Sequence, residues 1–371
     1  MDLMAKIAID ARQLKGTGAG RYLDRLIYYL QQIDNDNDYI ILLKPEDIDS
    51  WQISNSNFTK IACPHKEFTF DEQIGLRKQL NKLKPDLVHF GMVQQPIFYS
   101  GPHVTTMHDL TTARFRNQDK NPIVFYLKQR VYIFVNKRVA KKSNHIITPT
   151  QFVKKDIAKF TGINLDKITV TYEAADPITA PLESLQSLVN KDFIMFVGRP
   201  NAHKNLEQLI DAYVKIKEQY PKLYLVLVGK TNLNYKRIAL DVANRKIDKV
   251  IFTDYISDGQ LRWLYEHCSA YIFPSLSEGF GLPGLEAMLH GAPVVSSNAT
   301  CLTEVYGPAA HYFNPLDIDD MANKIKEVLA NRTLRQNLIK AGYKQVARYS
   351  WKLMAEETLK IYRKALEERS E

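Results

Sequence analysis

Two glutamates eight positions apart lie around a glycine-bearing loop. Glu278 and Glu286 bracket the sequence GFGLPGL, which follows a strand-like run and leads into a helix-like run. We expect Glu278 in the loop and Glu286 about two turns into the helix. The backbone amides of residues 280–282 would then lack partners within the helix, which favours phosphate binding. Ionised carboxylates accept hydrogen bonds from hydroxyl groups. The pattern therefore predicts a ligand with a diphosphate and hydroxylated ends, as in a nucleotide sugar.

An isolated pair of this kind is more often part of an ordinary strand-loop-helix unit with both carboxylates in solvent. The surrounding residues favour ligand binding: PSLSEGFGLPGLEAM begins at Pro274, and GAPVVSSN begins at Gly291. Over these positions the chain resembles the donor-site signature of the retaining glycosyltransferases of family 4. The resemblance implies that Glu278 binds the transferred sugar and that Glu286 binds the ribose. It also implies donor contacts at Gly279, Phe280, Gly281 and Leu282.

A second candidate segment is the loop GRPNAHKN, residues 198–205. It leads into a helix, so its basic side chains can face one pocket at the carboxyl end of a sheet. A departing nucleoside diphosphate gains negative charge, which a metal ion or fixed basic side chains can stabilise. The loop resembles the family pattern G-R-x-x-x-x-K-N at Gly198, Arg199, Lys204 and Asn205. The resemblance implies that Arg199 and Lys204 bind the diphosphate and that Gly198 and Asn205 belong to the donor site.

The first half of the chain offers two further segments. His108 and Asp109 follow a predicted strand and are similar to the family's H-D-L. His108 could hydrogen-bond the transferred sugar, although a histidine taken alone is more often packed or capping. The glycine loop before the first helix is not a dinucleotide G-x-G-x-x-G, and it resembles the family's G-x-G-R-Y instead. The resemblance places an acceptor or a donor phosphate near Gly16, Gly18, Gly20, Arg21 and Asp109.

Three positions follow the family more loosely. Glu304 is expected near the donor phosphates or at a helix cap. Tyr255 is expected beside the nucleobase, but Asp254 stands where the family often has glycine. Glu173 opens the sequence EAAD, which replaces the common N-G-V-D and leaves the hinge geometry open.

Length and composition exclude several classes of protein. A chain of 371 residues suffices for two domains, and 45% hydrophobic with 25% charged residues is typical of a globular protein. No run of about 18 apolar residues predicts a membrane span, and no signal peptide is indicated. Cys63, Cys268 and Cys301 have neither metal-ligand nor disulfide spacing, which favours a reducing cytoplasm.

Nearly the whole net charge of +9 lies between Arg114 and Lys142. Against one acid, Asp119, this segment has nine basic residues: Arg114, Arg116, Lys120, Lys128, Arg130, Lys137, Arg138, Lys141 and Lys142. Its middle is rich in apolar and aromatic side chains. A basic, apolar helix indicates docking on an anionic membrane surface, but an ordinary domain helix with one buried side fits equally well. No nucleic-acid motif accompanies the charge, so no nucleic-acid partner is expected.

Strand-like and helix-like runs alternate, which predicts an α/β fold with two Rossmann-like domains. The predicted strands are 6–10, 39–43, 86–90, 104–107, 145–148, 193–197, 223–228, 250–252, 270–273 and 293–296. The predicted helices are 20–33, 70–83, 122–140, 151–160, 205–219, 235–245, 258–267 and 282–290. We place an acceptor-binding domain at 1–178, a donor-binding domain at 179–349, and a helix at 350–371 with Ser350 as its cap. The family's GT-B architecture implies that the domains face each other across a cleft and that the last helix returns to the first domain.

The resemblance to the family thus implies a retaining hexosyltransferase, which we expect to be metal-independent. We expect it to move mannose from a GDP- or UDP-linked sugar to a glycan or a polyprenyl- or other lipid-linked acceptor in cell-surface polysaccharide synthesis. No D-x-D motif stands at a suitable place, so no metal and no cofactor beyond the donor is expected. We expect a cytoplasmic protein, peripheral on the inner face of the membrane if the basic helix binds lipid. The alternatives are a nucleotide-sugar epimerase and a non-catalytic GT-B binding protein, because the fold serves all three.

Overall fold

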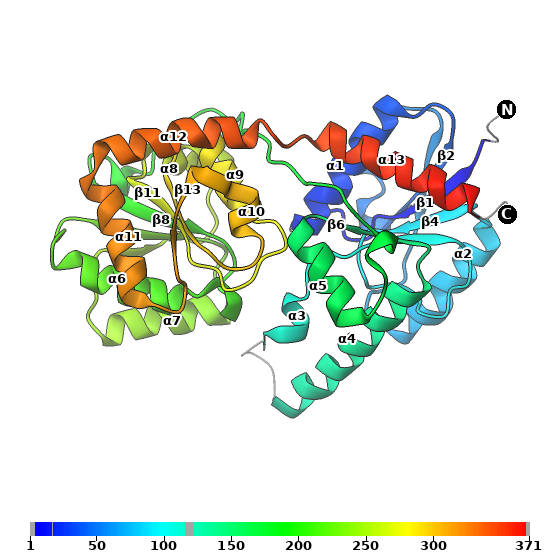
Figure 1. The fold of residues 1–371 in the computed structure, drawn as a ribbon, viewed down its shortest axis with the longest axis horizontal. Helices are drawn as coiled ribbons and strands as arrows, with labels where there is room; N and C mark the ends of the chain where they lie inside the picture. Colours follow the sequence, from blue (N-terminus) through cyan, green and yellow to red (C-terminus); the bar gives the residue numbers. More distant parts are fainter. Residues whose placement is uncertain (1–3, 17, 116–121, 369–371) are drawn as a thin grey trace. The chain divides into compact units, whose positions relative to one another are not determined.

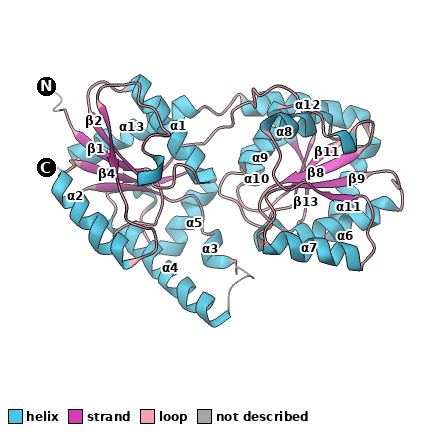
Figure 2. Cartoon of the chain, turned by 180° about the vertical axis from the view of Figure 1, so that it is seen from behind, coloured by secondary structure: helices cyan, strands magenta, loops and turns pink. Residues whose placement is uncertain are grey.

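The computed structural model describes residues 4–16, 18–115 and 122–368 and is shown in Figure 1. The chain forms two compact units. The first comprises Met1–Ala113, Leu127–Glu173 and Ser350–Glu371, and the second comprises Arg114–Tyr126 and Ala174–Tyr349. The main break therefore follows Glu173, where the sequence analysis placed the boundary at 178. In each unit a sheet is covered by helices (Figure 2).

The first unit contains a seven-stranded parallel sheet. In spatial order its strands are β3 (Phe58–Ala62), β2 (Asp38–Leu43), β1 (Lys6–Asp10), β4 (Leu87–Phe90), β5 (His103–Thr106), β6 (His145–Thr148) and β7 (Ile168–Val170). Its helices are α1 (Gly18–Ile33), α2 (Arg77–Leu83), α3 (Thr111–Arg114), α4 (Pro122–Lys142), α5 (Gln151–Thr161) and α13 (Trp351–Glu367), where Arg114 and the start of α4 up to Tyr126 are grouped with the second unit. A π-helix, Glu72–Leu76, runs directly into α2. Strands β1 and β4–β6 are almost entirely buried, as expected for a sheet covered on both faces.

The second unit contains a six-stranded parallel sheet. Its strands, in spatial order, are β10 (Val250–Phe252), β9 (Tyr224–Val228), β8 (Phe193–Val197), β11 (Ala270–Phe273), β12 (Val294–Ser297) and β13 (Ala310–Phe313). Its longer helices are α6 (Leu206–Lys217), α7 (Leu233–Asn244), α8 (Asp258–His267), α9 (Leu282–Leu289), α10 (Leu302–Tyr306), α11 (Ile318–Ala330) and α12 (Arg332–Val346). Each sheet starts at an inner strand, runs outward on one side and then crosses to the other side, which is the doubly wound Rossmann-like topology. The predicted fold class is confirmed.

All ten predicted strands and all eight predicted helices are present, most with ends shifted by one or two residues. The prediction missed three strands, β3, β7 and β13, and the helices α3, α10, α11 and α12. The predicted helix 70–83 is a π-helix followed by α2, and it begins at Glu72.

The last helix belongs to the first unit. Ser350 accepts a hydrogen bond from the amide of Leu353, which caps the start of α13 as predicted. One side of α13 is buried against α1, and Met354 and Tyr362 lie on that side with no exposed surface. The hydroxyl of Tyr362 lies 2.5 Å from Nδ1 of the buried His89 on β4.

Two predictions from composition concern the cysteines and membrane-crossing helices. All three cysteines are buried and unpaired. Within residues 4–16, 18–115 and 122–368, no helix combines the length and apolar character that a membrane crossing requires. Arg116, Asp119 and Lys120 of the basic segment lie outside the described residues.

Candidate functional site

The candidate donor site lies in the second unit, where the strand order of the sheet reverses between β8 and β11. Strands β8 and β11 are neighbours, and the chain leaves β8 toward one edge of the sheet and β11 toward the other. In doubly wound sheets ligands bind at such a switch point, outside the carboxyl ends of the strands. The loop after β8 carries Arg199 and Lys204, and the loop after β11 carries Glu278. The amide of Leu276 donates to the carbonyl of His203, which ties the two loops together at 2.7 Å.

Lys204 and Glu278 form an ion pair across these loops. Lys204 Nζ lies 2.5 Å from Glu278 Oε1, and the two side chains are 15% and 13% exposed. The ammonium group also lies 5.3 Å from the ring centre of Phe273, at the end of β11. The amide of Glu278 donates to Thr300 Oγ1, and the carbonyl of Glu278 accepts from Cys301 Sγ. Glu278 is therefore held from both sides by the backbone and by Lys204.

The start of α9 is shaped for close approach by a ligand. Gly281, the N-cap, has a φ of 93°, and among the described residues no side chain caps this end. Pro283 has no amide hydrogen, and Gly284 donates its amide to the carbonyl of Gly281 at 3.1 Å. In this first turn the amide of Leu282 is therefore the group that a ligand or water can satisfy. Tyr306 donates its hydroxyl hydrogen bond to the carbonyl of Gly281 at 2.6 Å. A Cβ at Gly284 would lie 2.3 Å from the Tyr306 ring, so only glycine fits between the helix and this tyrosine.

Glu286 lies little more than one turn into α9, because the helix begins at Leu282. The predicted depth of two turns is wrong. Its side chain is 8% exposed, and the hydroxyl of Tyr265 lies 3.4 Å from Oε2. A mostly buried carboxylate that accepts from a tyrosine hydroxyl can also accept hydrogen bonds from ligand hydroxyls.

The other predicted residues of the β8 loop differ in their surroundings. Arg199 is exposed, and within the described residues no contact joins its side chain to Lys204 or Glu278. Asn205 has a φ of 59° and donates through Nδ2 to the carbonyl of Pro315 at 2.8 Å. Its side chain thus fixes the start of α6. Gly198 accepts a hydrogen bond from the hydroxyl of Tyr235.

Asp254 occupies the family's glycine position without disturbing the loop. Its φ is 58°, a left-handed conformation that aspartate tolerates better than most residues. Its Oδ1 accepts from the amide of Thr231 at 2.7 Å, which joins the loops after β9 and β10. Tyr255 beside it is 82% exposed, and Glu304 lies half-buried on α10.

In the first unit His108 belongs to a second polar cluster. Its Nδ1 lies 3.1 Å from Oε1 of Glu173, and its Nε2 lies 3.1 Å from the carbonyl of Gly91. The ring of Tyr22 packs edge-on against it, with 5.1 Å between ring centres. Burial lowers the pKa of His108, but the hydrogen bond and negative charge of Glu173 outweigh burial, and the net shift is upward. The histidine is therefore held by contacts at both ring nitrogens, and Glu173 stabilises its charged form relative to a free histidine.

The glycine loop leads into α1. Gly16 and Gly20 touch backbone carbonyls, because a Cβ at either would lie within 2.7 Å of the carbonyl of Gln13 or Leu14. Gly18 and Arg21 are exposed in the first turn of α1. Asp109 accepts from the amide of Thr111 at 2.9 Å and so orders the turn into α3.

Sequence reasoning missed three residues of these clusters. Glu173 was noted only as a departure from the family, yet it is the partner of His108. Thr300 and Tyr306 hold the β11 loop and were not singled out. Both Glu173 and His108 follow strands of one parallel sheet, which is the signal that could have paired them, but β7 was not predicted.

A surface cavity of about 690 Å³ lies apart from these predicted residues. Its lining includes Ile178, Glu266 and His290, whose polar groups bond one another: His290 Nε2 accepts from the amide of Ile178, and Nδ1 faces Glu266. We assign no ligand to it.

The two parallel sheets define a doubly wound protein, and the loops after the neighbouring strands β8 and β11 carry its candidate donor residues. A model of the family described as "Glycosyl transferases group 1" matches residues 182–345, and one described as "Glycosyltransferase Family 4" matches residues 16–177. The chain belongs to glycosyltransferase family 4, so the resemblance drawn from the motifs is confirmed.

Curated relatives extend this comparison. The O-antigen chain mannosyltransferase B of Escherichia coli is 28% identical over 291 residues, covering 72% of this chain and 73% of the relative. The serotype-specific mannosyltransferase WbdA of Escherichia coli is 30% identical over 224 residues, covering 57% of this chain. That match spans only 28% of the length of WbdA.

Solved structures agree on the fold. Sucrose-phosphate synthase from Thermosynechococcus elongatus superposes with a TM-score of 0.77 at 18% identity, covering 97% of this chain and 98% of that chain. HepE of Anabaena in complex with UDP-glucose gives a TM-score of 0.74 at 16% identity, covering 97% of this chain and 100% of that chain.

Proposed function

We propose that this chain is a retaining, metal-independent hexosyltransferase that moves mannose from a nucleotide-diphosphate sugar to a glycan or lipid-linked acceptor. The observation that carries the proposal is the Lys204–Glu278 pair beside the uncapped start of α9. A cation, a fixed carboxylate and the amide of Leu282 at the helix start belong to these two loops, which suits a diphosphate that departs from a sugar. The preference for mannose rests on the curated mannosyltransferases that the chain resembles.

Each residue has a distinct role in this proposal. Lys204, Arg199 and the amide of Leu282 stabilise the negative charge that develops on the leaving diphosphate, in place of a metal ion. When the donor enters, the Lys204 ammonium turns from Glu278 to the phosphates. The freed Glu278 carboxylate then accepts hydrogen bonds from the sugar, and Glu286 accepts them from the ribose. For His108, contact with the transferred sugar stays a prediction from the sequence.

A thermal-shift panel tests the donor site. The chain is melted with GDP, UDP, their mannose and glucose conjugates, and unrelated nucleotides, with and without magnesium. A ligand at 100 times its Kd stabilises by about 2.7 kcal/mol, which a melting curve detects. We expect one nucleotide class to raise the Tm without magnesium, and we expect Lys204→Ala to lose the effect.

Product analysis separates the proposal from its alternatives. Incubation with the stabilising donor and an extract of cell-surface glycan should give transfer to the glycan with retained anomeric configuration. An isomerised sugar formed without acceptor would identify an epimerase. Binding without turnover in any mixture would identify a non-catalytic protein.

A further inference from the structure

The basic helix α4 has an apolar outer face. Val139 and Ala140 are buried in the first unit. Leu127, Val131 and Phe134, by contrast, are 60%, 61% and 56% exposed. These three recur at i, i+4 and i+7, so they form one stripe along the helix. Figures 1 and 2 show α4 extending beyond the sheet of its unit. One side of α4 is therefore packed as in an ordinary domain helix, and the exposed apolar stripe lies on another side. Docking on a membrane stays a prediction.

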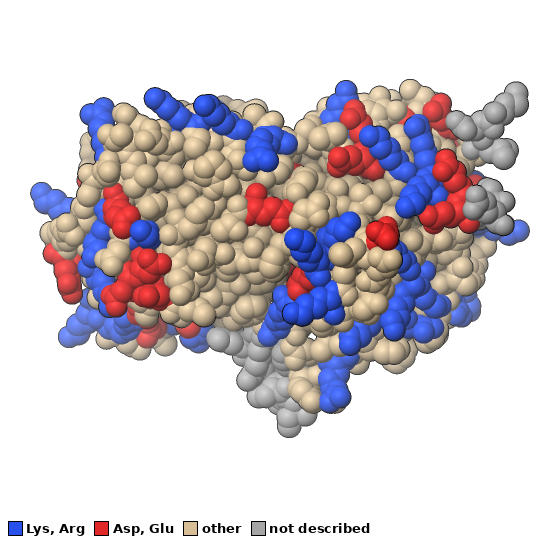
Figure 3. All heavy atoms as spheres, in the orientation of Figure 1, with Lys and Arg blue, Asp and Glu red and all other residues tan. Residues whose placement is uncertain are grey.

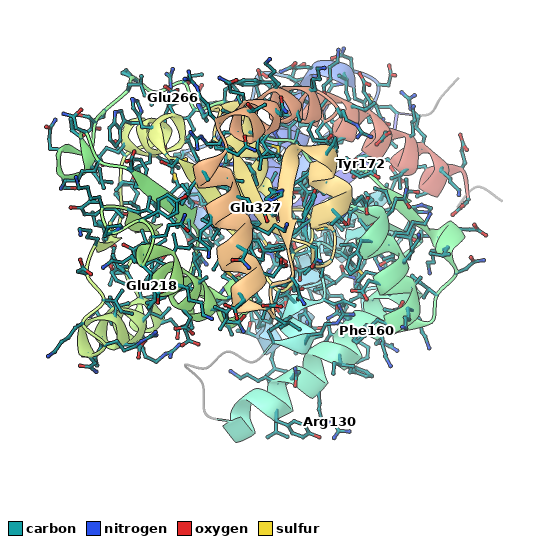
Figure 4. All side chains as sticks on the ribbon, turned by 60° about the vertical axis from the view of Figure 1, so that its left-hand side comes forward. Arg130, Phe160, Tyr172, Glu218, Glu266 and Glu327 are labelled. Carbon is teal, nitrogen blue, oxygen red and sulfur yellow. The ribbon has the colours of Figure 1, made fainter. Side chains whose placement is uncertain are left out.

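Positive charge surrounds this stripe. Residues 127–142 contain six basic side chains and no acidic one. Lys and Arg gather over the region of α4 in the surface view (Figure 3). Figure 4 shows Arg130 pointing away from the body of the unit, whereas Phe160 of α5 lies close to α4, where its ring centre is 5.6 Å from Lys137 Nζ.

A second exposed apolar group lies on residues 65–76, named here the aromatic loop. Phe68 and Phe70 are 74% and 87% exposed, and Ile74 is 51% exposed. Phe68 has a φ of 62°, a left-handed conformation that a bulky residue rarely adopts. The loop thus holds its largest apolar side chains in solvent.

A buried charge cluster fixes the aromatic loop from behind. Arg12, 2% exposed, pairs with Asp10 at 2.7 Å and with Glu72 at 2.9 Å. Arg12 also donates to the carbonyl of His65 at 2.8 Å, and the other oxygen of Glu72 accepts from the amide of Phe68 at 3.1 Å. The exposure of the aromatic side chains is therefore built into the fold.

The aromatic loop and α4 are joined through residues 97 and 98. Gln73 accepts from the amide of Ile97 at 2.9 Å, and Arg138 of α4 donates to the carbonyl of Ile97 at 3.3 Å. The guanidinium of Arg138 lies 5.2 Å from the ring centre of Phe98, which is itself 54% exposed. The two apolar groups are thus parts of one surface.

We propose that this surface, made of the aromatic loop, Phe98 and the outer face of α4, docks on an anionic lipid bilayer. Exposed Phe, Leu and Val side chains enter the headgroup region, and the basic residues meet the negative lipid charge. The excess of basic side chains favours a lipid surface over a glycan, which offers no such charge unless it is acidic. This inference goes beyond the proposed function and does not depend on it.

Vesicle sedimentation of the full chain tests the proposal without donor or acceptor. Vesicles of phosphatidylcholine are compared with vesicles that also contain phosphatidylglycerol. We expect binding to the anionic vesicles, weakened by salt. The Phe70→Ser, Phe134→Ser variant and the Lys137→Gln, Lys141→Gln variant should bind less, the latter by about fivefold per lysine. Matched controls on the second unit are Leu233→Ser with Leu240→Ser, and Lys236→Gln with Lys340→Gln, all exposed residues.

The outcomes are decisive in both directions. Loss of binding in the loop and helix variants, with binding retained in the controls and unchanged Tm, supports the proposal. No sedimentation with anionic vesicles, or equal loss in the controls, overturns it. Self-association that needs Phe70 and Phe134 without lipid would also overturn it, since the surface would then belong to a dimer. Nucleotide-induced stabilisation of the same variants shows separately whether the donor site is intact.

Discussion

Lys204 Nζ and Glu278 Oε1 lie 2.5 Å apart, although 74 positions separate the two residues in the chain. The pair exists because β8 and β11 are adjacent parallel strands, so the loops that follow their carboxyl ends lie side by side. Lys204 is proposed to bind the diphosphate of the donor and Glu278 its sugar. In this structure the two charges neutralise each other. Donor binding would then exchange one ion pair for two ligand contacts.

The first prediction concerns this pair. Glu278→Gln should reduce turnover by about 100-fold or more, since the amide loses the charge that binds the sugar hydroxyls most strongly. Lys204→Met should instead weaken binding of the free nucleoside diphosphate. Steady-state kinetics and nucleotide titration distinguish the two effects. Unchanged turnover in Glu278→Gln would refute its role.

The same variants should also change the free energy of unfolding. Each single change leaves one charge unpaired in a mostly buried place, which should cost roughly 1–3 kcal/mol of unfolding free energy. The double variant should cost less than the sum of the two. The exposed pair Lys215–Asp319 is the matched control, and its disruption should lower the stability less than either single change at Lys204 or Glu278.

The strands that the sequence failed to predict all lie at sheet edges, although the edge strand β10 was predicted to the residue. β3 and β7 are the two edges of the first sheet, and β13 is one edge of the second. An edge strand has one neighbour and a half-exposed surface, so its residues need not form a buried apolar run. Inner strands such as β11 are buried throughout and were predicted to the residue.

The candidate site could likewise be predicted only in part from the sequence. Glu278 and Lys204 could be predicted because they stand in local motifs. Their mutual contact and the pairing of His108 with Glu173 could not, because each joins loops that only the sheet order brings together. The same holds for the surface of α4, since the sequence shows its composition but not which of its apolar side chains are covered.

The second prediction follows from His108 and Glu173. The pKa of His108 is raised above its ordinary value of 6.5, so the pair stabilises the folded state fully below pH about 6.5 and this contribution is lost as pH rises through the raised pKa. Glu173→Gln should therefore destabilise most at low pH and little at high pH, as measured by urea unfolding across pH 5 to 9. An equal loss at every pH would show that the pair contributes no charge-dependent stability. The exposed His311–Glu327 pair, changed to Glu327→Gln, is the control.

The third prediction concerns His89, whose pKa is shifted downward rather than upward. Complete burial lowers the pKa of His89 to about 3. A histidine with a lowered pKa favours folding above its unfolded value near 6.5, and this stability is lost as pH falls from about 6.5 toward 3. His89→Leu should flatten that acid branch of the unfolding curve. Tyr362→Phe keeps the titrating ring and should retain the acid branch, while it costs about 1 kcal/mol at neutral pH through the lost hydrogen bond.

The fourth prediction concerns the glycine beside Tyr306. Gly284→Ala places a methyl group 2.3 Å from the tyrosine ring, which must move and thereby release the hydroxyl that holds the carbonyl of Gly281. Overpacking of this kind costs about 1–3 kcal/mol, and here it also displaces the turn that begins α9. Nucleotide-induced stabilisation should fall together with the Tm. In the comparison variant Gly342→Ala the new methyl lies 3.1 Å from Cγ and 3.2 Å from Cβ of Met288, much farther than the 2.3 Å at Gly284, so both quantities should change less. If Gly284→Ala lowers the Tm but binds nucleotide as the parent does, then the start of α9 does not contact the diphosphate.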